Sequence, residues 1–278
     1  MSTCAIIVSF RTGAVLADCL AALASASGLD EIVIVDNGNA PAETLTLDRF
    51  AAADARVKLQ RGQGNVGFAA ACNLAARQAV SDVLVFVNPD VILRADAISA
   101  LAVALAAAPP PAIVGGDLRD GQGRPDRGSR RDRLTLWRAF VSFSGLSRLE
   151  RVTPALRDFN RHRDPLPDRA VGVGAVSGAL MAMRRVDLNA LGGFDEEYFV
   201  HVEDLDLCRR AEAAGWRVLF QPGPHGLHVR SSSDVGGGEL RRHKARSMAR
   251  YFRKFAQGPV EKVCAGVAGS FLILVVGR

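Results

Sequence analysis

The sequence predicts an α/β fold in which a mostly parallel central sheet is flanked by helices. Two observations predict this fold. In the first third of the chain, short apolar runs alternate with Ala- and Leu-rich segments of helical length. Several of the apolar runs also stop at polar turns such as Asp36-Asn37-Gly38 and Asn88-Pro89-Asp90. Strands that alternate with helices pair in parallel through crossover connections, which bury the sheet on both faces.

The elements of this first part follow a βαβαβ order. We expect strands at 5–9, 31–35, 56–60 and 82–87, and helices at 12–25, 68–80 and about 96–107. Pro109-Pro110-Pro111 then interrupts the pattern. The segment 119–169 is rich in Arg, Gly, Pro and Asp without clear periodicity, which predicts long, mobile loops at the surface. Regular structure is expected to resume at 170–183 and in a strand at 216–220.

Composition limits the class of protein. Apolar content of 49% and charged content of 23% are ordinary for a globular protein, and 278 residues suffice for a large core. The net charge of +6 predicts an anionic partner without choosing among nucleotide, nucleic acid and membrane. Five scattered cysteines and an N-terminus without a basic region predict a cytoplasmic protein with no disulfide framework and no secretion signal.

An acidic segment between Gly192 and Arg210 is the most informative feature of the chain. Its acids are Asp195, Glu196, Glu197, Glu203, Asp204 and Asp206. Carboxylates this dense repel one another, so they need a cation, a helix N-terminus or a catalytic task. The residues from Glu203 onward also suit the first turn of a helix that ends at Gly215. Taken alone, this segment leaves the structural and catalytic interpretations equally open.

Three further features follow predicted strands, where open α/β sheets bind their ligands. Asp36 ends the second strand, where a carboxylate can accept a hydrogen bond from a nucleobase or ribose. The loop Gly62-Gln63-Gly64-Asn65-Val66-Gly67 opens a helix, and Asp90 can bind a hard cation together with diphosphate oxygens. Each feature taken singly is better explained as a turn or a strand stop.

Two histidines near the predicted strand at 216–220 are candidate metal ligands. His228, beside an aspartate from a neighbouring strand end, can complete a Mg²⁺ or Mn²⁺ site, and His225 competes for that role. A lone histidine is nevertheless more often structural than a ligand.

The C-terminal part combines a basic helix with an apolar run. The expected helix at 239–256 interleaves aromatic residues with Arg241, Arg242, Lys244, Arg246, Arg250, Arg253 and Lys254. The apolar run at 263–276 is shorter than the roughly 20 residues that span a bilayer. One interpretation is a core element beside a solvated helix face. The other, which we favour as a hypothesis, is a contact with the cytoplasmic face of a membrane.

Together these motifs resemble family 2 glycosyltransferases of the GT-A fold, within the rhamnosyltransferase-like branch. The resemblance spans about residues 5–235, and each motif occurs in the order of the family. The matching motifs are Val8-Ser9-Phe10, Val35-Asp36-Asn37, Gly64 to Ala69 with Asn73, Asn88-Pro89-Asp90, Ser177-Gly178-Ala179, Gly192 to Glu196, Glu203 to Arg209, and His228 with Ser231 to Ser233. Each motif is weak alone, but the ordered set is specific.

The resemblance implies a role for each matching residue. Asp36 would hold the base of the nucleotide, and Asp90 with His228 would bind Mg²⁺ or Mn²⁺. Asp204 would be the general base. The nucleotide-sugar pocket would be lined by Ser9, Arg11, Asn65, Gly67, Phe68 and Asn88. The acceptor-side supports would be Asp195, Glu196, Glu203 and Asp206, the last two by orienting and capping their helix.

Two positions depart from the family pattern. Arg11 stands where an Asn is common, and Asn88 leaves the metal motif with one carboxylate. Asn88-Pro89-Asp90 is itself usual in the rhamnosyltransferase-like branch.

The resemblance also implies a division of the chain and an activity. Residues 1–235 would form the GT-A domain, with a nucleotide-sugar half at 1–108, a loop region at 109–169 and an acceptor-side half at 170–235. Residues 236–278 lie beyond the resemblance and form the C-terminal helical segment for which we favour a membrane contact as a hypothesis. The implied reaction is an inverting transfer of a sugar, in first place L-rhamnose, from a dTDP- or UDP-sugar. The acceptor would be a saccharide or a lipid-linked saccharide in cell-surface polysaccharide synthesis, with no nucleic-acid partner.

Two alternatives use other features of the chain. Gly62, Gly64 and Gly67 match the GxGxxG pattern of dinucleotide-binding proteins, which would make the protein an NAD-dependent oxidoreductase. That function gives no role to the acidic segment. A polyanion-binding protein would instead use the basic C-terminal helix with Arg127, Arg130, Arg131 and Arg133.

Overall fold

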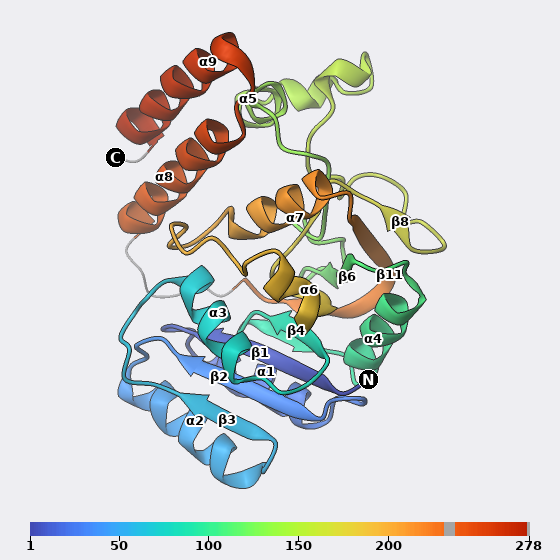
Figure 1. Ribbon diagram of the computed structural model, residues 1–278, viewed down its shortest axis with the longest axis vertical. Helices are drawn as coiled ribbons and strands as arrows, with labels where there is room; N and C mark the ends of the chain where they lie inside the picture. The colour runs from blue at the N-terminus through green and yellow to red at the C-terminus, as the bar shows by residue number, and fades with distance from the viewer. Residues whose placement is uncertain (231–236, 277–278) are drawn as a thin grey trace.

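The computed structural model describes residues 1–230 and 237–276 (Figure 1). Within these residues, a central sheet of nine strands runs in the order β3-β2-β1-β4-β10-β6-β11-β5, with β8 paired to β11. A second sheet joins the short strands β7 and β9. The boundary predicted at 235 and the motif residues Ser231 to Ser233 lie outside the described residues.

The first four strands of the large sheet are parallel, as predicted. They are β1 (Thr3–Ser9), β2 (Glu31–Asp36), β3 (Val57–Gln60) and β4 (Val83–Val87). Every residue of β1, β2 and β4 is buried, which explains their continuous apolar runs. The connections contain α1 (Val15–Ala24), α2 (Pro41–Ala53) and α3 (Phe68–Gln78). The helix α2 was not predicted.

Two hydrophobic cores lie on the two faces of this sheet. Cys4, Ile6 and Val8 of β1 pack with residues of α3, α7 (Glu203–Ala213) and α8 (Gly237–Phe255). Ala5 and Ile7 pack with residues of α1 and α4 (Ala97–Ala107) on the other face. The alternation along β1 is the period of two that a strand imposes, so helices cover both faces as predicted.

The second part of the sheet mixes directions. It contains β5 (Val91–Leu93), β6 (Ala112–Arg119), β10 (Leu180–Arg184) and β11 (Arg217–His228), with α6 (Arg185–Ala190) after β10. β10 is antiparallel to both β4 and β6, whereas β6 and β11 are parallel. β11 continues well past the predicted end at residue 220. Register shifts between Gln221 and Gly226 accommodate Pro222 and Pro224, which lack the amide hydrogen of a regular strand residue.

The prediction of long, mobile loops at 119–169 is wrong for part of that segment. It holds β7 (Arg130–Arg131), α5 (Leu136–Ser144) and two 3₁₀ turns, η1 (Leu146–Leu149) and η2 (Pro154–Leu156). β7 pairs with β9 (Ala175–Val176), and β8 (Val171–Gly172) follows the segment. Buried Arg130 donates to the carbonyls of Arg161, Asp164 and Pro165 at 2.9–3.0 Å. Polar contacts of this kind order the segment without leaving an apolar period in the sequence.

Two C-terminal helices lie at one end of the molecule (Figure 1). Met248, Tyr251 and Phe252 of α8 are buried in the core. α9 (Gly258–Phe271) packs against α8 through Ala265 and Gly269 and ends in a π-helical turn, Leu272–Val276. Within residues 1–230 and 237–276, the helices are all too short or too polar to cross a membrane.

Candidate active site

Two adjoining cavities lie beyond the carboxyl ends of β1, β2 and β4. The first, which we call the strand-end cavity, has a volume of about 400 Å³. The second, the Asp204 cavity, has a volume of about 700 Å³. The residues that line both are Phe68, Asn88, Asp90, Val200 and Leu240. Because these walls are shared, a ligand in the first cavity can extend into the second.

The strand-end cavity contains most of the residues predicted to bind the nucleotide-sugar. Its lining includes Arg11, Asn65, Gly67, Phe68, Asn88 and Asp90. Asn37 holds the glycine loop by donating to Asn65 Oδ1 at 2.9 Å and by accepting from Val66 N at 3.2 Å. Gly67 has a φ of +85°, and an added Cβ would lie 2.6 Å from the Phe199 carbonyl oxygen. Only glycine fits this position.

Ser9 and Asp36 lie behind this cavity and do not line it. Asp36 Oδ1 accepts from the backbone amides of Gly38 and Asn39, and from the Asn39 side chain at 2.9 Å. Ser9 is fully buried and donates to Asn39 Oδ1. Both therefore shape the turn that presents Asn37 to the cavity. Contact between Asp36 and a nucleobase stays a prediction.

His228 bridges two carboxylates at the junction of the cavities. Its Nε2 lies 3.4 Å from Asp90 Oδ1, and its Nδ1 lies 3.1 Å from Asp126 Oδ2. Burial disfavours the charged imidazole, but the hydrogen bond to Asp126 and the nearby carboxylate of Asp90 outweigh it and raise the pKa of His228 to about 9. His225 instead accepts from the Asp117 amide and lines neither cavity. Of the two candidate metal ligands, His228 therefore lies at the cavity and His225 does not.

Asp90 and His228 fit a divalent cation. Asp90 Oδ1 is buried and accepts no hydrogen bond in the described part of the chain. His228 Nε2 faces it, while Asp126 anchors the other ring nitrogen as carboxylates do for metal-binding histidines. No group of three or more His, Cys, Asp or Glu residues suited to a metal occurs within 1–230 and 237–276. Two protein ligands suit Mg²⁺ or Mn²⁺, which takes its remaining ligands from diphosphate oxygens and water.

Asp204 is the second residue of α7 and lines the Asp204 cavity. Its Oδ2 accepts from Arg131 at 2.6 Å and from the Gly178 amide at 3.1 Å. Its Oδ1 accepts from the Leu205 amide at 2.7 Å. These three donors fix the orientation of the Asp204 carboxylate.

Glu203 lines the same cavity in a different environment. Burial, followed by the charge of Asp204, raises its pKa well above the usual range, and its Oε2 has no hydrogen-bond partner among the described residues. A buried carboxyl group without a hydrogen-bond partner favours its protonated form, so Glu203 can carry a proton beside Asp204. Before them, His201 and Val202 adopt φ values of 66° and 76°. Positive φ at a β-branched residue such as Val202 is strained, and such strain clusters at functional sites.

The other predicted acids line neither cavity. Asp206 is fully buried and contacts Arg210 and Lys254, each at 2.6 Å. Asp195 contacts Lys254 at 2.7 Å and Arg250 at 2.9 Å. Glu196 accepts from the Asn73 side chain at 2.9 Å. The basic helix α8 therefore supplies the cations that hold much of the acidic segment together. A role of these three acids on the acceptor side stays a prediction.

Several residues of the Asp204 cavity were not predicted to lie in the glycosyltransferase site. Asp126 and Arg230 were not singled out at all, and Arg127, Arg131 and Lys244 were named only as cations of a polyanion-binding surface. Burial, followed by the charges of Arg127 and Arg230, lowers the pKa of Lys244, so these cations lie close together. Asp126 and Arg131 come from the segment expected to be loops. In the sequence, nothing distinguishes Arg131 from the arginines around it.

Comparison with known proteins assigns the chain to a family. The family described as "Glycosyltransferase like family 2" matches residues 2–254. An N-acetylglucosaminyl-diphospho-decaprenol L-rhamnosyltransferase of Mycobacterium tuberculosis is 41% identical over 61 residues, which are 22% of this chain and 20% of that protein. Rhamnosyltransferase WbbL of Escherichia coli K12 is 40% identical over 52 residues, 19% of this chain and 20% of that protein. The matched segments thus span about a fifth of these curated relatives.

Solved structures share the fold at low sequence identity. Mannosyltransferase PcManGT from Pyrobaculum calidifontis, solved with GDP-Man and Mn²⁺, has a TM-score of 0.59 and 19% identity, covering 99% of this chain and 70% of that one. GalNAc-T7, solved with UDP, GalNAc and Mn²⁺, has a TM-score of 0.63 and 15% identity, covering 98% and 55%. These matches confirm the GT-A fold. With the family match over residues 2–254, they show that the chain belongs to glycosyltransferase family 2.

Proposed function

We propose that the protein is an inverting glycosyltransferase that transfers L-rhamnose from dTDP-L-rhamnose to a hydroxyl of a lipid-linked saccharide, in the synthesis of a cell-surface polysaccharide. The observation that carries this proposal is that Asp90, His228 and Asp204 line one cavity, which adjoins the strand-end cavity. The names of the two rhamnosyltransferases favour this sugar, and the name of the mycobacterial one favours a lipid diphosphate acceptor. Another dTDP- or UDP-sugar is the alternative donor.

The donor would lie across both cavities. Its nucleoside would occupy the strand-end cavity beside Asn37, Asn65 and Arg11, and its diphosphate would lie at the shared wall. A divalent cation held there by Asp90 and His228 would neutralise the charge that develops on the diphosphate. Arg127 and Lys244 add positive charge to the same cavity, where a preorganised field lowers the barrier most.

Asp204 would act as the general base. Its Oδ2 accepts from both Arg131 and the Gly178 amide, whereas its Oδ1 accepts from the Leu205 amide and keeps a second lone pair for the acceptor hydroxyl. The acceptor oxygen forms a bond to the anomeric carbon while its proton passes to Asp204 Oδ1. The bond from that carbon to the diphosphate oxygen breaks, and the nucleoside diphosphate leaves. A single displacement inverts the configuration of the sugar.

The proposed location is the cytoplasmic face of a membrane, contacted by the C-terminal segment 236–278. Val260, Val263 and Val267 of α9 are each at least 67% exposed. An exposed apolar helix face beside the basic helix α8 supports this location.

A thermal-shift panel tests the donor. The purified chain is mixed with dTDP-, UDP- and GDP-sugars, each with Mn²⁺ and with EDTA. We expect the largest rise in Tm for dTDP-L-rhamnose with Mn²⁺, because binding to the native state stabilises it by mass action. NADH is the control ligand, since a response to it would support the oxidoreductase alternative. The absence of any metal-dependent response to a nucleotide sugar would contradict the proposal.

A further inference from the structure

Exposed apolar side chains gather on two short segments of the chain. On α5 and η1 with the turn that follows, they are Trp137, Phe140, Phe143, Leu149 and Val152. On α9 and its π-helical turn, they are Val260, Val263, Val267, Phe271, Ile273 and Leu274. Every exposed aromatic side chain of residues 1–230 and 237–276 belongs to one of these two segments. Patches of this kind mark interaction surfaces.

Both helices bury small residues and expose large ones. α9 buries Ala265 and Gly269 against α8, and a Cβ added to Gly269 would lie 3.1 Å from Ala249 Cβ. Its valines and Phe271 point outward, between 59% and 75% exposed. α5 buries Ala139 and Val141, whereas Trp137, Phe140 and Phe143 are each more than half exposed. In an ordinary surface helix, the large apolar side chains face the protein core and the exposed face is polar. In α5 and α9, large apolar side chains are exposed instead.

The two segments lie at the same end of the molecule. Figure 1 shows α5, α8 and α9 together at one end of the long axis, opposite to α2 and β3. Tyr251 of α8 donates to the carbonyl oxygen of Leu134, just before α5. Phe143 of α5 also lines the Asp204 cavity. The aromatic side of α5 thus leads from the outer surface to the mouth of that cavity.

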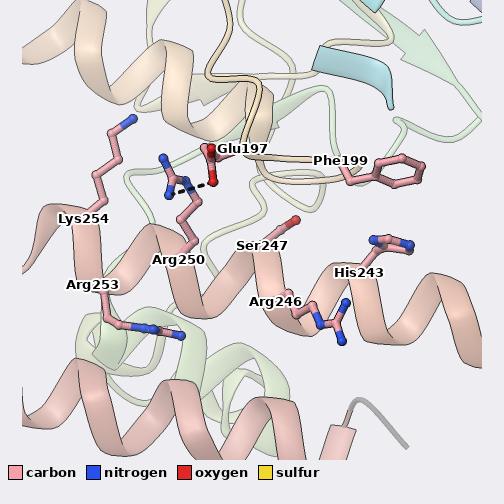
Figure 2. A pocket seen from close by; sticks show the side chains of 8 residues that line it. All are labelled: Glu197, Phe199, His243, Arg246, Ser247, Arg250, Arg253 and Lys254. Atoms are coloured by element: carbon pink, nitrogen blue, oxygen red, sulfur yellow. Dashed lines mark ion pairs between the residues drawn. The ribbon is translucent and has the colours of Figure 1, made fainter. Parts of the chain in front are cut away.

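Positive charge surrounds these apolar residues. A groove of about 740 Å³ runs along α8, and Figure 2 shows Arg246 and Arg253 extending from the side of α8 opposite to Glu197. Arg250 and Lys254 in the same groove are paired with Asp195. The exposed cations Arg148 and Arg151 flank Leu149 and Val152, and Lys262 is exposed on α9. Aromatic and aliphatic side chains among arginines and lysines suit an anionic bilayer surface.

We propose that α5, η1 and α9 form one bilayer-docking face, which holds the mouth of the Asp204 cavity against an anionic membrane. A lipid-linked acceptor would then enter past Phe143 without leaving the lipid phase. The docking face itself is independent of the sugar transferred, and only the route of the acceptor rests on the proposed function. This face extends the membrane contact from the C-terminal segment to α5, which lies more than a hundred residues earlier in the chain.

Vesicle flotation tests the face directly. The probes are phosphatidylcholine vesicles with and without phosphatidylglycerol. Phe140→Ser/Leu149→Ser removes apolar surface from α5 and η1, and Val263→Ser/Val267→Ser removes it from α9. Val80→Ser/Val103→Ser is the matched control, because these valines are 72% and 69% exposed and lie on neither segment. Trp137 is left intact because its indole donates to the Ala155 carbonyl.

We expect the wild-type chain to float with vesicles that contain phosphatidylglycerol, and less so at high salt. Each double variant on the face should lower partitioning about 10-fold, and the control should leave it unchanged. All variants should keep the wild-type Tm response to the nucleotide sugar, which shows that they are folded. In vesicles, the face variants should also lose transfer to a lipid-linked acceptor while keeping transfer to a water-soluble saccharide.

Two results would overturn the proposal. One is wild-type partitioning of Phe140→Ser/Leu149→Ser, which would remove α5 from the face. The other is a wild-type dimer without vesicles that the face variants turn into a monomer, because the face would then join two copies of the chain. Flotation requires no turnover, so a failure of the proposed rhamnosyl transfer leaves this test unaffected.

Discussion

The strand-end cavity and the Asp204 cavity are built in different ways, although they share a wall. The first is lined mainly by loops that directly follow parallel strands, and amide groups such as those of Asn37 and Asn65 dominate its polar contacts. The second gathers charged side chains from the 119–169 segment, β11, α7 and α8. In open α/β sheets, a crevice forms beyond the carboxyl ends of the parallel strands, so the fold itself accounts for the first cavity. The second exists only when ion pairs join segments that are far apart in the sequence.

The largest effect is expected at Asp204. Asp204→Asn keeps the size of the side chain but cannot accept the acceptor's proton, so kcat should fall about 10³-fold. Nucleotide binding should persist because the strand-end cavity is untouched. Initial rates and the thermal shift with donor measure the two effects, and Asp18→Asn on the exposed side of α1 is the control. Equal rates for Asp204→Asn and the wild type would remove the base assignment.

A change at the shared wall should impair both cavities. Asp90→Asn weakens the proposed cation site, and the rate should fall about 100-fold, as for losses around a bound metal. The part of the donor's thermal shift that depends on Mn²⁺ should disappear. Asp96→Asn, close in sequence but exposed, is the control. An unchanged Mn²⁺ response in Asp90→Asn would place the cation elsewhere.

The third prediction concerns Lys254 and the stability of the fold, not the rate of sugar transfer. Among the residues that the structure describes, Lys254→Met leaves the fully buried Asp206 side chain with Arg210 and Tyr198 as partners. It also removes one of two cations that contact Asp195. The free energy of unfolding in urea should fall by about 2 kcal/mol, less than for a buried pair that loses its only partner. Arg253→Met on the same helix should change it much less. If both variants lost the same free energy of unfolding, the loss would come from removing a positive charge and not from breaking the contact between Lys254 and Asp206.

The smallest effect is a pH dependence at Glu203. Because burial raises the folded-state pKa of Glu203, the proton it holds stabilises the fold below about pH 4.5, its ordinary pKa. That stabilisation is lost as the pH rises toward the folded-state pKa. Glu203→Gln should therefore match the wild type at acid pH and become more stable than it above neutrality, by on the order of 1 kcal/mol. Parallel Tm curves from pH 4 to 9 would contradict the prediction.

The sequence was sufficient for the strand-end cavity for a physical reason. Three of the four parallel strands, β1, β2 and β4, are buried along their whole length, so their apolar runs and the turns after them are visible as a pattern. Asp90, Asn65 and Gly67 then fall at predictable places. Asp36 and Ser9 lie behind the cavity wall because both form hydrogen bonds with the side chain of Asn39. These hydrogen bonds leave no pattern in the sequence.

The Asp204 cavity was predicted only in part. His228 and Asp204 were identified through motifs, but their partners Asp126 and Arg131 belong to a segment without periodicity. Likewise, Arg250 and Lys254 were expected among exposed charges, and the structure pairs them with Asp195 and Asp206. Such contacts join residues that lie between 48 and 102 positions apart in the sequence, so a local sequence pattern does not reveal them.

The pairing of α8 with the acidic segment has a consequence for biosynthesis. The acids at 195–206 leave the ribosome first, and the cations at 250–254 follow about fifty residues later. Until then, Asp206 has no lysine partner, so we expect the nascent domain to remain protease-sensitive around α7. Stalled chains that end at residue 236 should be cleaved there, while chains that expose all of α8 should resist. Helix α8, which is synthesised after α7, would thus complete the fold around α7, and a chain that stops before α8 would lack the cations that pair with Asp195 and Asp206.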